Sequence, residues 1–233
     1  MIKAVENVGP CTLIHADWRS LLIPEPTAMW RALMVPRITA IVTDPPYGVG
    51  YVKGATGAAS RPGGSVHRGD APIVGDDEPF DPVPILCLGV EALLWGADRY
   101  RARLPEGGRF LAWDKLAGRE PWDSFGDVDF AWHSVAGPSR IFSMLWKGVA
   151  CEKSGEDNGK RYHPAQKPVR LMAWCLDQLR DPSVVFDPYM GSGSTAVAAV
   201  RSNIGRFIGC EVERRWFDVA VERVRREMEW SRA

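Results

Sequence analysis

The sequence predicts an α/β fold, in which buried strands alternate with loops and helices. In the stretch 184–200 an apolar run ends at Asp187, a loop with two glycines follows, and an Ala/Val-rich helix begins. The continuous β-prone run 38–43 has the composition of a strand buried on both faces of a parallel sheet. Strand, loop and helix patterns recur along the chain, which favours a layered fold of this class.

Length and composition indicate one globular domain covering residues 1–233. The chain is 45% hydrophobic and 25% charged, and its formal net charge is zero, so contacts with nucleic acid would come from local basic patches. Its five cysteines lie far apart, which argues against a disulfide framework and a zinc site. The N-terminus lacks a secretory pattern and no apolar run could span a bilayer, so we expect a cytoplasmic protein that binds neither membrane nor metal.

The first predicted strand, 12–15, is closely followed by Asp17. Open α/β sheets bind ligands just beyond their strand ends, so Asp17 is a candidate ligand contact. An acid at a strand end is also an ordinary loop residue, and the sequence leaves both interpretations open.

The run 38–43 leads directly into Asp44-Pro45-Pro46-Tyr47. A residue before proline is kept extended, so Asp44 and Pro45 have a fixed conformation before any ligand arrives. The Asp44 carboxylate and the Pro45 carbonyl then offer two acceptors to a primary amine, and Tyr47 offers a ring on which a flat heterocycle could stack. The alternative is that the tetrapeptide is merely a stiff turn.

The middle of the chain combines polar segments with further strands. Residues 48–79 are glycine-rich and predict a mobile loop, and their basic residues are Lys53, Arg61, His67 and Arg68. A short helix is expected at 82–88 and strands at 92–95 and 110–113. Residues 127–146 alternate apolar and polar around a Gly-Pro-Ser turn, which predicts an antiparallel hairpin.

The segment from Lys147 to Arg161 is locally basic, since it also contains Lys153 and Lys160. It is either a solvated loop or a contact for DNA phosphates. A helix with Pro168 in its first turn follows, and a last helix is expected at about 213–228.

The loop after strand 184–186 has the features of a small-molecule site. Pro188 ends the strand, Gly191 and Gly193 let the backbone approach a ligand, and Ser194 or Thr195 could cap the following helix. No lysine follows the glycines, which excludes a Walker phosphate loop. A second apolar run ends at Glu211, where nucleotide-binding sheets place an acid on ribose hydroxyls, so a nucleoside-containing cofactor between Asp187 and Glu211 is predicted.

Four ordered segments resemble amino-group DNA methyltransferases of the permuted β class. They are Asp44-Pro45-Pro46-Tyr47, residues 163–168, the loop 187–195 and Gly209-Cys210-Glu211. The resemblance implies a Rossmann-like class I fold, with a mostly parallel seven-stranded sheet, helices on both faces and the catalytic motif preceding the cofactor loop. It also implies a short target-recognition insertion at about 115–160.

The resemblance further implies a function and its site residues. The expected cofactor is S-adenosylmethionine, and the expected substrate is double-stranded DNA with its target base flipped out. Adenine N6 is expected because Asp44 holds the first motif position. Cytosine N4 is the alternative, as is a catalytically silent DNA-binding regulator, and a homodimer could supply contacts that one chain lacks. The implied cofactor residues are Asp17, Lys167, Asp187, Pro188, Gly191, Gly193, Ser194, Thr195 and Glu211; the implied catalytic residues are Asp44, Pro45, Pro46 and Tyr47.

Overall fold

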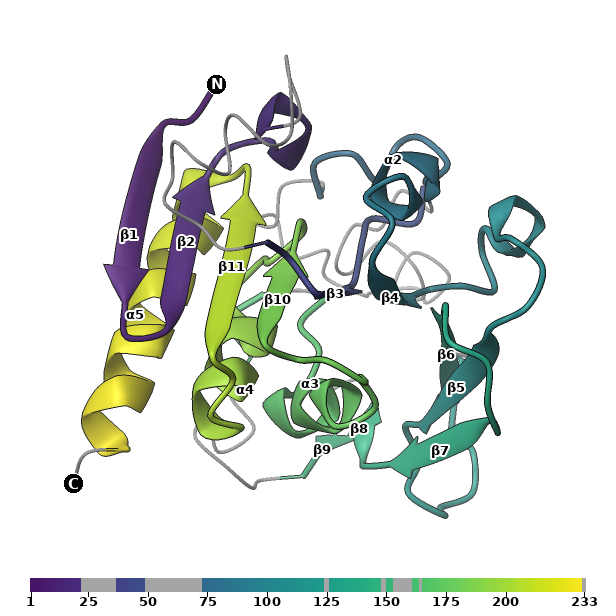
Figure 1. The fold of residues 1–233 in the computed structure, drawn as a ribbon. Helices are drawn as coiled ribbons and strands as arrows, with labels where there is room; N and C mark the ends of the chain where they lie inside the picture. Colours follow the sequence, from purple (N-terminus) through teal and green to yellow (C-terminus); the bar gives the residue numbers. More distant parts are fainter. Residues whose placement is uncertain are drawn as a thin grey trace.

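The computed structural model describes residues 1–21, 37–48, 73–123, 126–147, 150–152, 161–163 and 165–231. Within these ranges nine strands form one sheet in the order β1-β2-β11-β10-β3-β4-β6-β5-β7, and β8 and β9 form a separate pair (Figure 1). The main-sheet strands are β1 Ala4–Val8, β2 Cys11–His15, β3 Ala40–Thr43, β4 Glu91–Trp95, β5 Arg109–Asp114, β6 Val128–His133, β7 Arg140–Ser143, β10 Val184–Asp187 and β11 Arg206–Glu211. The small pair consists of β8 Trp146–Lys147 and β9 Ala150–Cys151.

The centre of the sheet is parallel, because β2, β11, β10, β3 and β4 all pair in the same direction. Figure 1 shows the arrowheads of β2, β11 and β10 pointing the same way. The carboxyl ends of these strands therefore meet at one edge, where Asp187 is in register with Gly209, and Glu211 with His15. The acids predicted to follow separate strands thus converge on one side of the molecule.

The other end of the sheet differs from the expectation of seven strands and a hairpin at 127–146. Strands β6 and β7 form there, but β5 lies between them, antiparallel to β6 and parallel to β7. Local alternation predicts that a segment is a strand but not which strand it pairs with, and the turn signal after β6 led to the wrong partner. Residues 115–160, expected to hold a target-recognition insertion, thus supply two strands of the main sheet.

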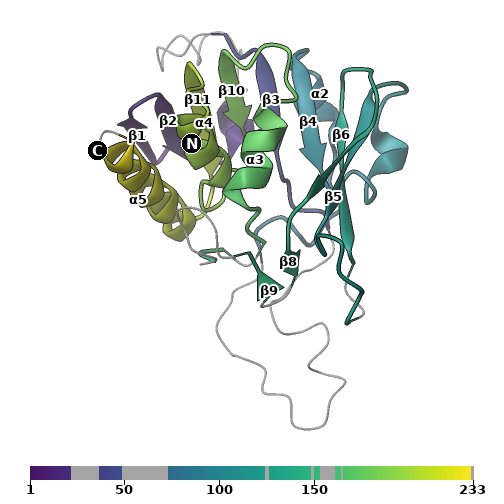
Figure 2. The same cartoon turned by 90° about the horizontal axis from the view of Figure 1, so that it is seen from below.

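Helices cover both faces of the sheet (Figure 2). On one face lie α3 Val169–Leu176, α4 Ser194–Arg201 and α5 Arg214–Trp230. On the other lie α2 Val83–Leu86 and the 3₁₀ helices Trp18–Leu21 and Arg101–Arg103. Successive side chains of a strand point into the two cores in turn. Val185 packs on the face covered by α3, α4 and α5, Phe186 packs on the opposite face, and both are fully buried. Burying such side chains contributes roughly 1.5–3 kcal/mol each, which holds the strand ends in fixed register.

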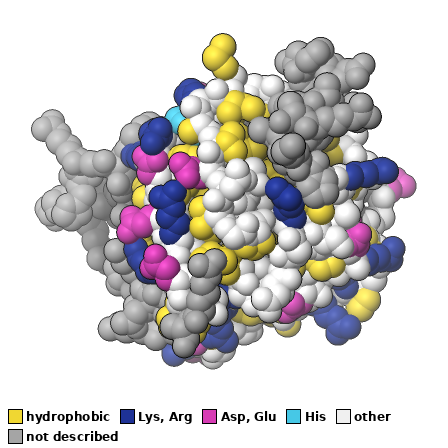
Figure 3. All heavy atoms as spheres, turned by 60° about the vertical axis from the view of Figure 1, so that its left-hand side comes forward, with side chains coloured by type: hydrophobic (Ala, Val, Ile, Leu, Met, Phe, Trp, Pro, Cys, Tyr) yellow, Lys and Arg dark blue, Asp and Glu magenta, His cyan; other side chains and the backbone are white. Residues whose placement is uncertain are grey.

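The surface on the side of β1 and α5 carries charges of both signs interspersed (Figure 3). Exposed pairs along α5 account for part of this, including Arg214 with Asp218 and Arg226 with Glu222. No helix in the described ranges is long and apolar enough to cross a membrane. Those ranges also contain no group of three His, Cys, Asp or Glu side chains placed to hold a metal ion.

Candidate active site

A cavity of about 580 Å³ opens at the carboxyl edge of the parallel strands. Each of β2, β3, β10 and β11 ends at its wall, so loops far apart in the sequence line one space. The predicted residues that line it are Asp17, Asp44, Pro45, Pro46, Tyr47, Lys167, Asp187, Pro188, Gly191, Ser194, Thr195 and Glu211. The structure therefore brings together the two motifs that the sequence separates by more than a hundred residues.

Asp187 ends β10 with its carboxylate buried. Its Oδ1 accepts hydrogen bonds from the Thr43 hydroxyl at 2.7 Å and from the Tyr189 N–H at 3.1 Å. Burial raises the pKa of Asp187 to about 6, although hydrogen bonds from Thr195, Thr43 and Tyr189 oppose the rise. A carboxylate fixed between β3 and β10 in this way is a preorganised acceptor.

Gly193 makes the turn from β10 into α4. It precedes the first helical residue with φ +84°, and a Cβ at this position would lie 2.8 Å from the Cβ of Ala220 on α5. Only glycine fits both the backbone conformation and the space. The helix begins at Ser194, and no side chain caps it, so the expectation that Ser194 or Thr195 acts as the cap is wrong.

Glu211 ends β11 beside that turn and is likewise buried. Its Oε1 accepts the Glu213 N–H at 2.7 Å, and the backbone of Gly191 also donates to the carboxylate. Burial, together with the nearby charge of Glu213, raises the pKa of Glu211 to about 7, although backbone hydrogen bonds from Glu213 and Gly191 oppose the rise. The group thus titrates near neutral pH, which is unusual for a glutamate and typical of functional sites.

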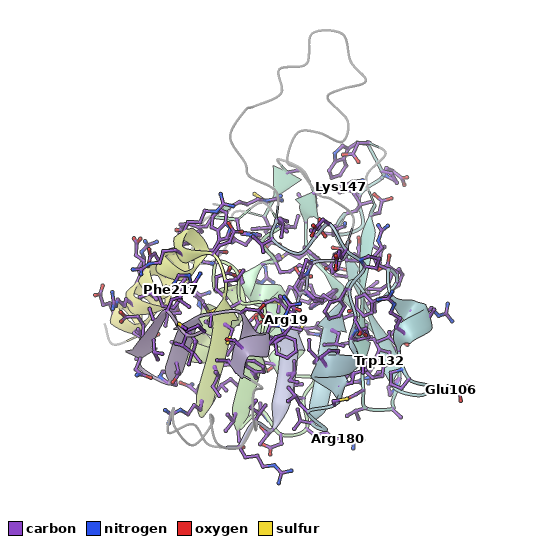
Figure 4. The ribbon with its side chains drawn as sticks, turned by 90° about the horizontal axis from the view of Figure 1, so that it is seen from above. Arg19, Glu106, Trp132, Lys147, Arg180 and Phe217 are labelled. Carbon is purple, nitrogen blue, oxygen red and sulfur yellow. The ribbon has the colours of Figure 1, made fainter. Side chains whose placement is uncertain are left out.

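Asp17 lies at the cavity wall beyond β2, and it is paired with Arg19. Arg19 Nε lies 3.0 Å from Oδ1, and Nη2 lies 2.9 Å from Oδ2. Although partial burial opposes it, this fork of hydrogen bonds lowers the pKa of Asp17. In the view from above, Arg19 lies near the centre of the molecule, over the strand ends (Figure 4).

Asp44 is held by two partners from different parts of the chain. The Tyr47 hydroxyl donates to Oδ1, and the Lys167 ammonium lies 2.8 Å from Oδ2. Lys167 is also 3.1 Å from the Tyr47 oxygen. Burial alone would lower the pKa of Lys167, but the carboxylates of Asp44 and Asp129 outweigh it and raise that pKa. Lys167 thus contacts the Asp44 motif, whereas the resemblance implies a place near the cofactor.

The ring of Tyr47 lies against Gly96, which follows β4. A Cβ on Gly96 would lie 2.0 Å from a ring carbon of Tyr47, and the glycine has φ +74°. Because the ring fits only where this side chain is absent, Gly96 fixes where the Tyr47 hydroxyl points. No role was expected of Gly96.

Asp76 is a second residue that the sequence reasoning missed. It is buried, and its Oδ1 accepts the N–H groups of Tyr47 and Gly48, each at 2.9 Å. It falls in the stretch 48–79, for which the sequence predicts a mobile loop. Residues 73–79 do pack against the site, so that prediction is wrong for this part of the loop.

Gln166 and Arg223 support the loop after β10. The Gln166 Oε1 accepts the Tyr162 N–H at 2.7 Å and lies 3.5 Å from the Ser192 hydroxyl. Arg223, buried on α5, donates to the Ser192 carbonyl at 2.7 Å. The segment 166–167 therefore contacts both loops of the cavity, Gln166 one and Lys167 the other.

The basic residues proposed to contact DNA have different outcomes. Lys53, Arg61, His67, Arg68, Lys153 and Lys160 lie outside the described residues. Arg161 is exposed, with its guanidinium 4.6 Å from the centre of the Trp146 ring. The expectation for Lys147 is wrong: its side chain is 2% exposed and its ammonium pairs with Asp123 at 2.9 Å and with Asp127, so it is already neutralised. Figure 4 shows it at the rim, away from Arg19.

Comparison with known proteins finds similarity in sequence. Residues 110–222 match the N6/N4 methyltransferase family model, described as DNA methylase. The chain is 40% identical over 72 residues to the type II methyltransferase M.HindIII of Haemophilus influenzae, covering 30% of this chain and 22% of that protein. It is 38% identical over 86 residues to M.HinfI of the same species, covering 35% and 23%. The chain spans about a quarter of the length of these curated relatives.

Two solved structures share the fold. The M1.HpyAVI complex with SAM has a TM-score of 0.52 at 20% identity, and the match covers 91% of this chain and 99% of that one. The PvuII DNA methyltransferase, described as cytosine-N4-specific, has a TM-score of 0.55 at 10% identity, covering 96% and 92%. These matches confirm the Rossmann-like fold expected from the sequence.

Proposed function

We propose that the protein transfers a methyl group from S-adenosylmethionine to an exocyclic amino group of a base in DNA, a function supported by the match of residues 110–222 to the N6/N4 DNA methylase family model. The observation that carries the proposal is the convergence of two loops on one cavity. The Asp44–Tyr47 loop has acceptors suited to an amine, and the ends of β10 and β11, at Asp187 and Glu211, have acceptors suited to a nucleoside cofactor.

The chemistry of the residues fits the cofactor. Glu211 is a buried acceptor at a strand end, the place where a carboxylate binds two ribose hydroxyls. Asp187 and the turn through Gly191 and Gly193 would hold the methionine part, and Asp17 would contact the adenine. Acidic side chains along the cavity favour a ligand with a positive charge, and the bound cofactor supplies an electrophilic methyl group on a sulfonium.

The Asp44 motif would bind the target amine. Its nitrogen is a poor nucleophile because the lone pair is delocalised into the ring of the base. Hydrogen bonds from the amine to the Asp44 carboxylate and the Pro45 carbonyl favour a pyramidal nitrogen, which localises the lone pair toward the methyl group. Asp44 then accepts the proton that leaves the nitrogen, directly or through water.

The proposed base is adenine, methylated at N6, because an aspartate holds the first position of the motif. The base would leave the helix stack, at an unstacking cost of a few kcal/mol. Methylation of cytosine N4 is the second candidate within the same chemistry.

Lysines and arginines of the stretch 53–68 and of the segment 153–161 are the proposed contacts for DNA phosphates, with Lys147 removed from that set. A second copy of the chain could extend this surface. The cytoplasmic location expected from the sequence belongs to the same proposal.

The test is transfer of a labelled methyl group from S-adenosylmethionine to mixed-sequence duplex DNA. The wild type should label the DNA, and Asp44→Ala, which lacks the amine acceptor, should label it at background level. Absence of label with the wild type, together with normal DNA binding, would instead support a catalytically silent regulator that retains the fold.

A further inference from the structure

We propose that Asp76 is a positioning residue that holds the Asp44–Tyr47 loop in its working shape. The inference rests on the proposed function, in which this loop binds the target amine. It concerns a residue outside both motifs, 29 positions beyond Tyr47.

One carboxylate oxygen of Asp76 serves two backbone groups. Its Oδ1 lies 2.9 Å from the nitrogen of Tyr47 and 2.9 Å from that of Gly48. These N–H groups follow β3, where the strand has ended and the sheet offers no partner. A partly buried N–H group that lacks an acceptor is unfavourable, so the Asp76 carboxylate favours the observed path of the loop.

The turn that carries Asp76 is fitted closely to the loop. Its N–H closes a turn onto the Ile73 carbonyl at 3.2 Å, and a Cβ on Gly75 would lie 3.5 Å from the Pro46 ring. Gly48 has φ +77°, and a Cβ there would lie 2.5 Å from the Glu78 carbonyl oxygen. The two segments therefore pass at backbone contact.

Burial distinguishes Asp76 from its acidic neighbours. Asp76 is 4% exposed, whereas Asp77 and Glu78 are exposed to solvent. Asp76 is thus the acid of this run whose carboxylate is turned toward the loop. It joins Gly48 and the turn at 73–76, the described residues on either side of the stretch 49–72.

Removing this acceptor should disturb Asp44 through Tyr47. The Tyr47 ring is fixed by Gly96 on one side and its backbone by Asp76 on the other, and its hydroxyl donates to Asp44. A shift of about 1 Å at a reacting group lowers rates by roughly 100-fold. The loops proposed to bind the cofactor follow other strands, β10 and β11, so the affinity of the protein for the cofactor should change little.

The experiment compares Asp76→Ala, Asp76→Asn and, as a surface control, Glu106→Gln, which lies at the edge of the molecule (Figure 4). Cofactor affinity is measured by calorimetry and methyl transfer by labelled cofactor. Hydrogen exchange is measured in the peptide 45–48. Pro45 and Pro46 have no amide hydrogen, so this peptide reports on Tyr47 and Gly48 directly.

We expect Asp76→Ala to lower kcat by roughly 100-fold and leave cofactor affinity within about threefold, with faster exchange in the peptide. Asp76→Asn keeps an oxygen acceptor, so it should recover most of both signals, and Glu106→Gln should match the wild type. Unchanged exchange and turnover in a folded Asp76→Ala variant would overturn the inference, as would equal loss of cofactor affinity and turnover. If the wild type transfers no methyl group, the proposed function fails, but the exchange measurement still decides the role of Asp76.

Discussion

The ammonium group of Lys167 occupies one face of the Asp44 carboxylate, with Nζ 2.8 Å from Oδ2. The other carboxylate oxygen accepts the Tyr47 hydroxyl, so both oxygens of Asp44 have a partner in this structure. In the proposed function, the target amine therefore shares an Asp44 oxygen with Lys167 or Tyr47, or takes the place of one of them. In each case Lys167 orients Asp44 and balances its charge, and both side chains are largely buried.

This arrangement predicts the effect of Lys167→Met. Turnover should fall by at least about tenfold, because Asp44 loses a preorganised charged donor. Cofactor affinity should change far less, since Lys167 contacts the Asp44–Tyr47 loop and not the loop after β10. Lys167→Arg retains the charge and serves as the control. A loss of cofactor affinity as large as the loss of kcat would show that Lys167 serves the cofactor, as the resemblance implies.

Substitution of Gly96 by alanine should lower turnover and leave cofactor affinity unchanged. The new methyl group would overlap the Tyr47 ring, so the ring must move and its hydroxyl leaves Asp44. Gly107→Ala is the matched control, because Gly107 also has positive φ, at +90°, with no atom within 4 Å of the added Cβ. Both variants should lose roughly 1–3 kcal/mol of stability to backbone strain. Only Gly96→Ala should lose turnover, by roughly 100-fold, measured at saturating cofactor.

The raised pKa of Glu211, about 7, predicts that cofactor affinity increases with pH. An ionised carboxylate is the better acceptor for ribose hydroxyls, so binding should release a proton and strengthen from about pH 6 to about pH 8. The folding stability of the free protein changes with pH in the opposite direction. The folded state binds the Glu211 proton more tightly than the unfolded state does. The stability that this proton contributes is therefore complete below the ordinary pKa of 4.5 and is lost as the pH rises through 7.

Calorimetry at several pH values, in buffers that differ in ionisation enthalpy, measures both the affinity and the proton release. Glu211→Gln should remove the response near pH 7 and leave a weaker one near 6, where Asp187 titrates. If this variant kept the wild-type response, another group would be responsible.

Mutations should also separate the roles of the two loops, the Asp44–Tyr47 loop and the loop region of Asp187 and Glu211. Asp44→Ala should abolish turnover while cofactor affinity remains largely intact, because in the proposed function its carboxylate contacts the amine and not the ribose. Glu211→Ala should weaken cofactor binding first. Calorimetry and transfer assays on both variants check this, and the same loss of cofactor binding in the two would contradict the division of roles.

Short-range signals in the sequence were sufficient to predict most of the cavity. Asp44-Pro45-Pro46 is constrained by its own prolines, and Gly193 by the backbone turn it makes, so their places follow from residues next to them. The C-terminal helix, expected at about 213–228, is α5 at Arg214–Trp230. Parallel strands then bring their ends together without any further signal.

Contacts made across the chain could not be predicted in this way. Asp76 and Gly96 act on Tyr47 from 29 and 49 positions away, and in sequence they are one acid among several and one glycine among 23. Lys147 resembled a phosphate contact until two aspartates were found beside it. The prediction that β6 and β7 pair as a hairpin was wrong for the same reason, since both strands pair with β5, which comes earlier in the chain.

The most direct measurement is mass spectrometry of the nucleosides released from duplex DNA after incubation with the wild type and S-adenosylmethionine. The account predicts N6-methyladenine, formed by the wild type and missing with Asp44→Ala. N4-methylcytosine as the sole product would overturn the choice of base while preserving amine chemistry. Methylation at a ring carbon, or no methylated nucleoside from a protein that binds both cofactor and DNA, would contradict the central claim that Asp44 presents an exocyclic amine to the cofactor.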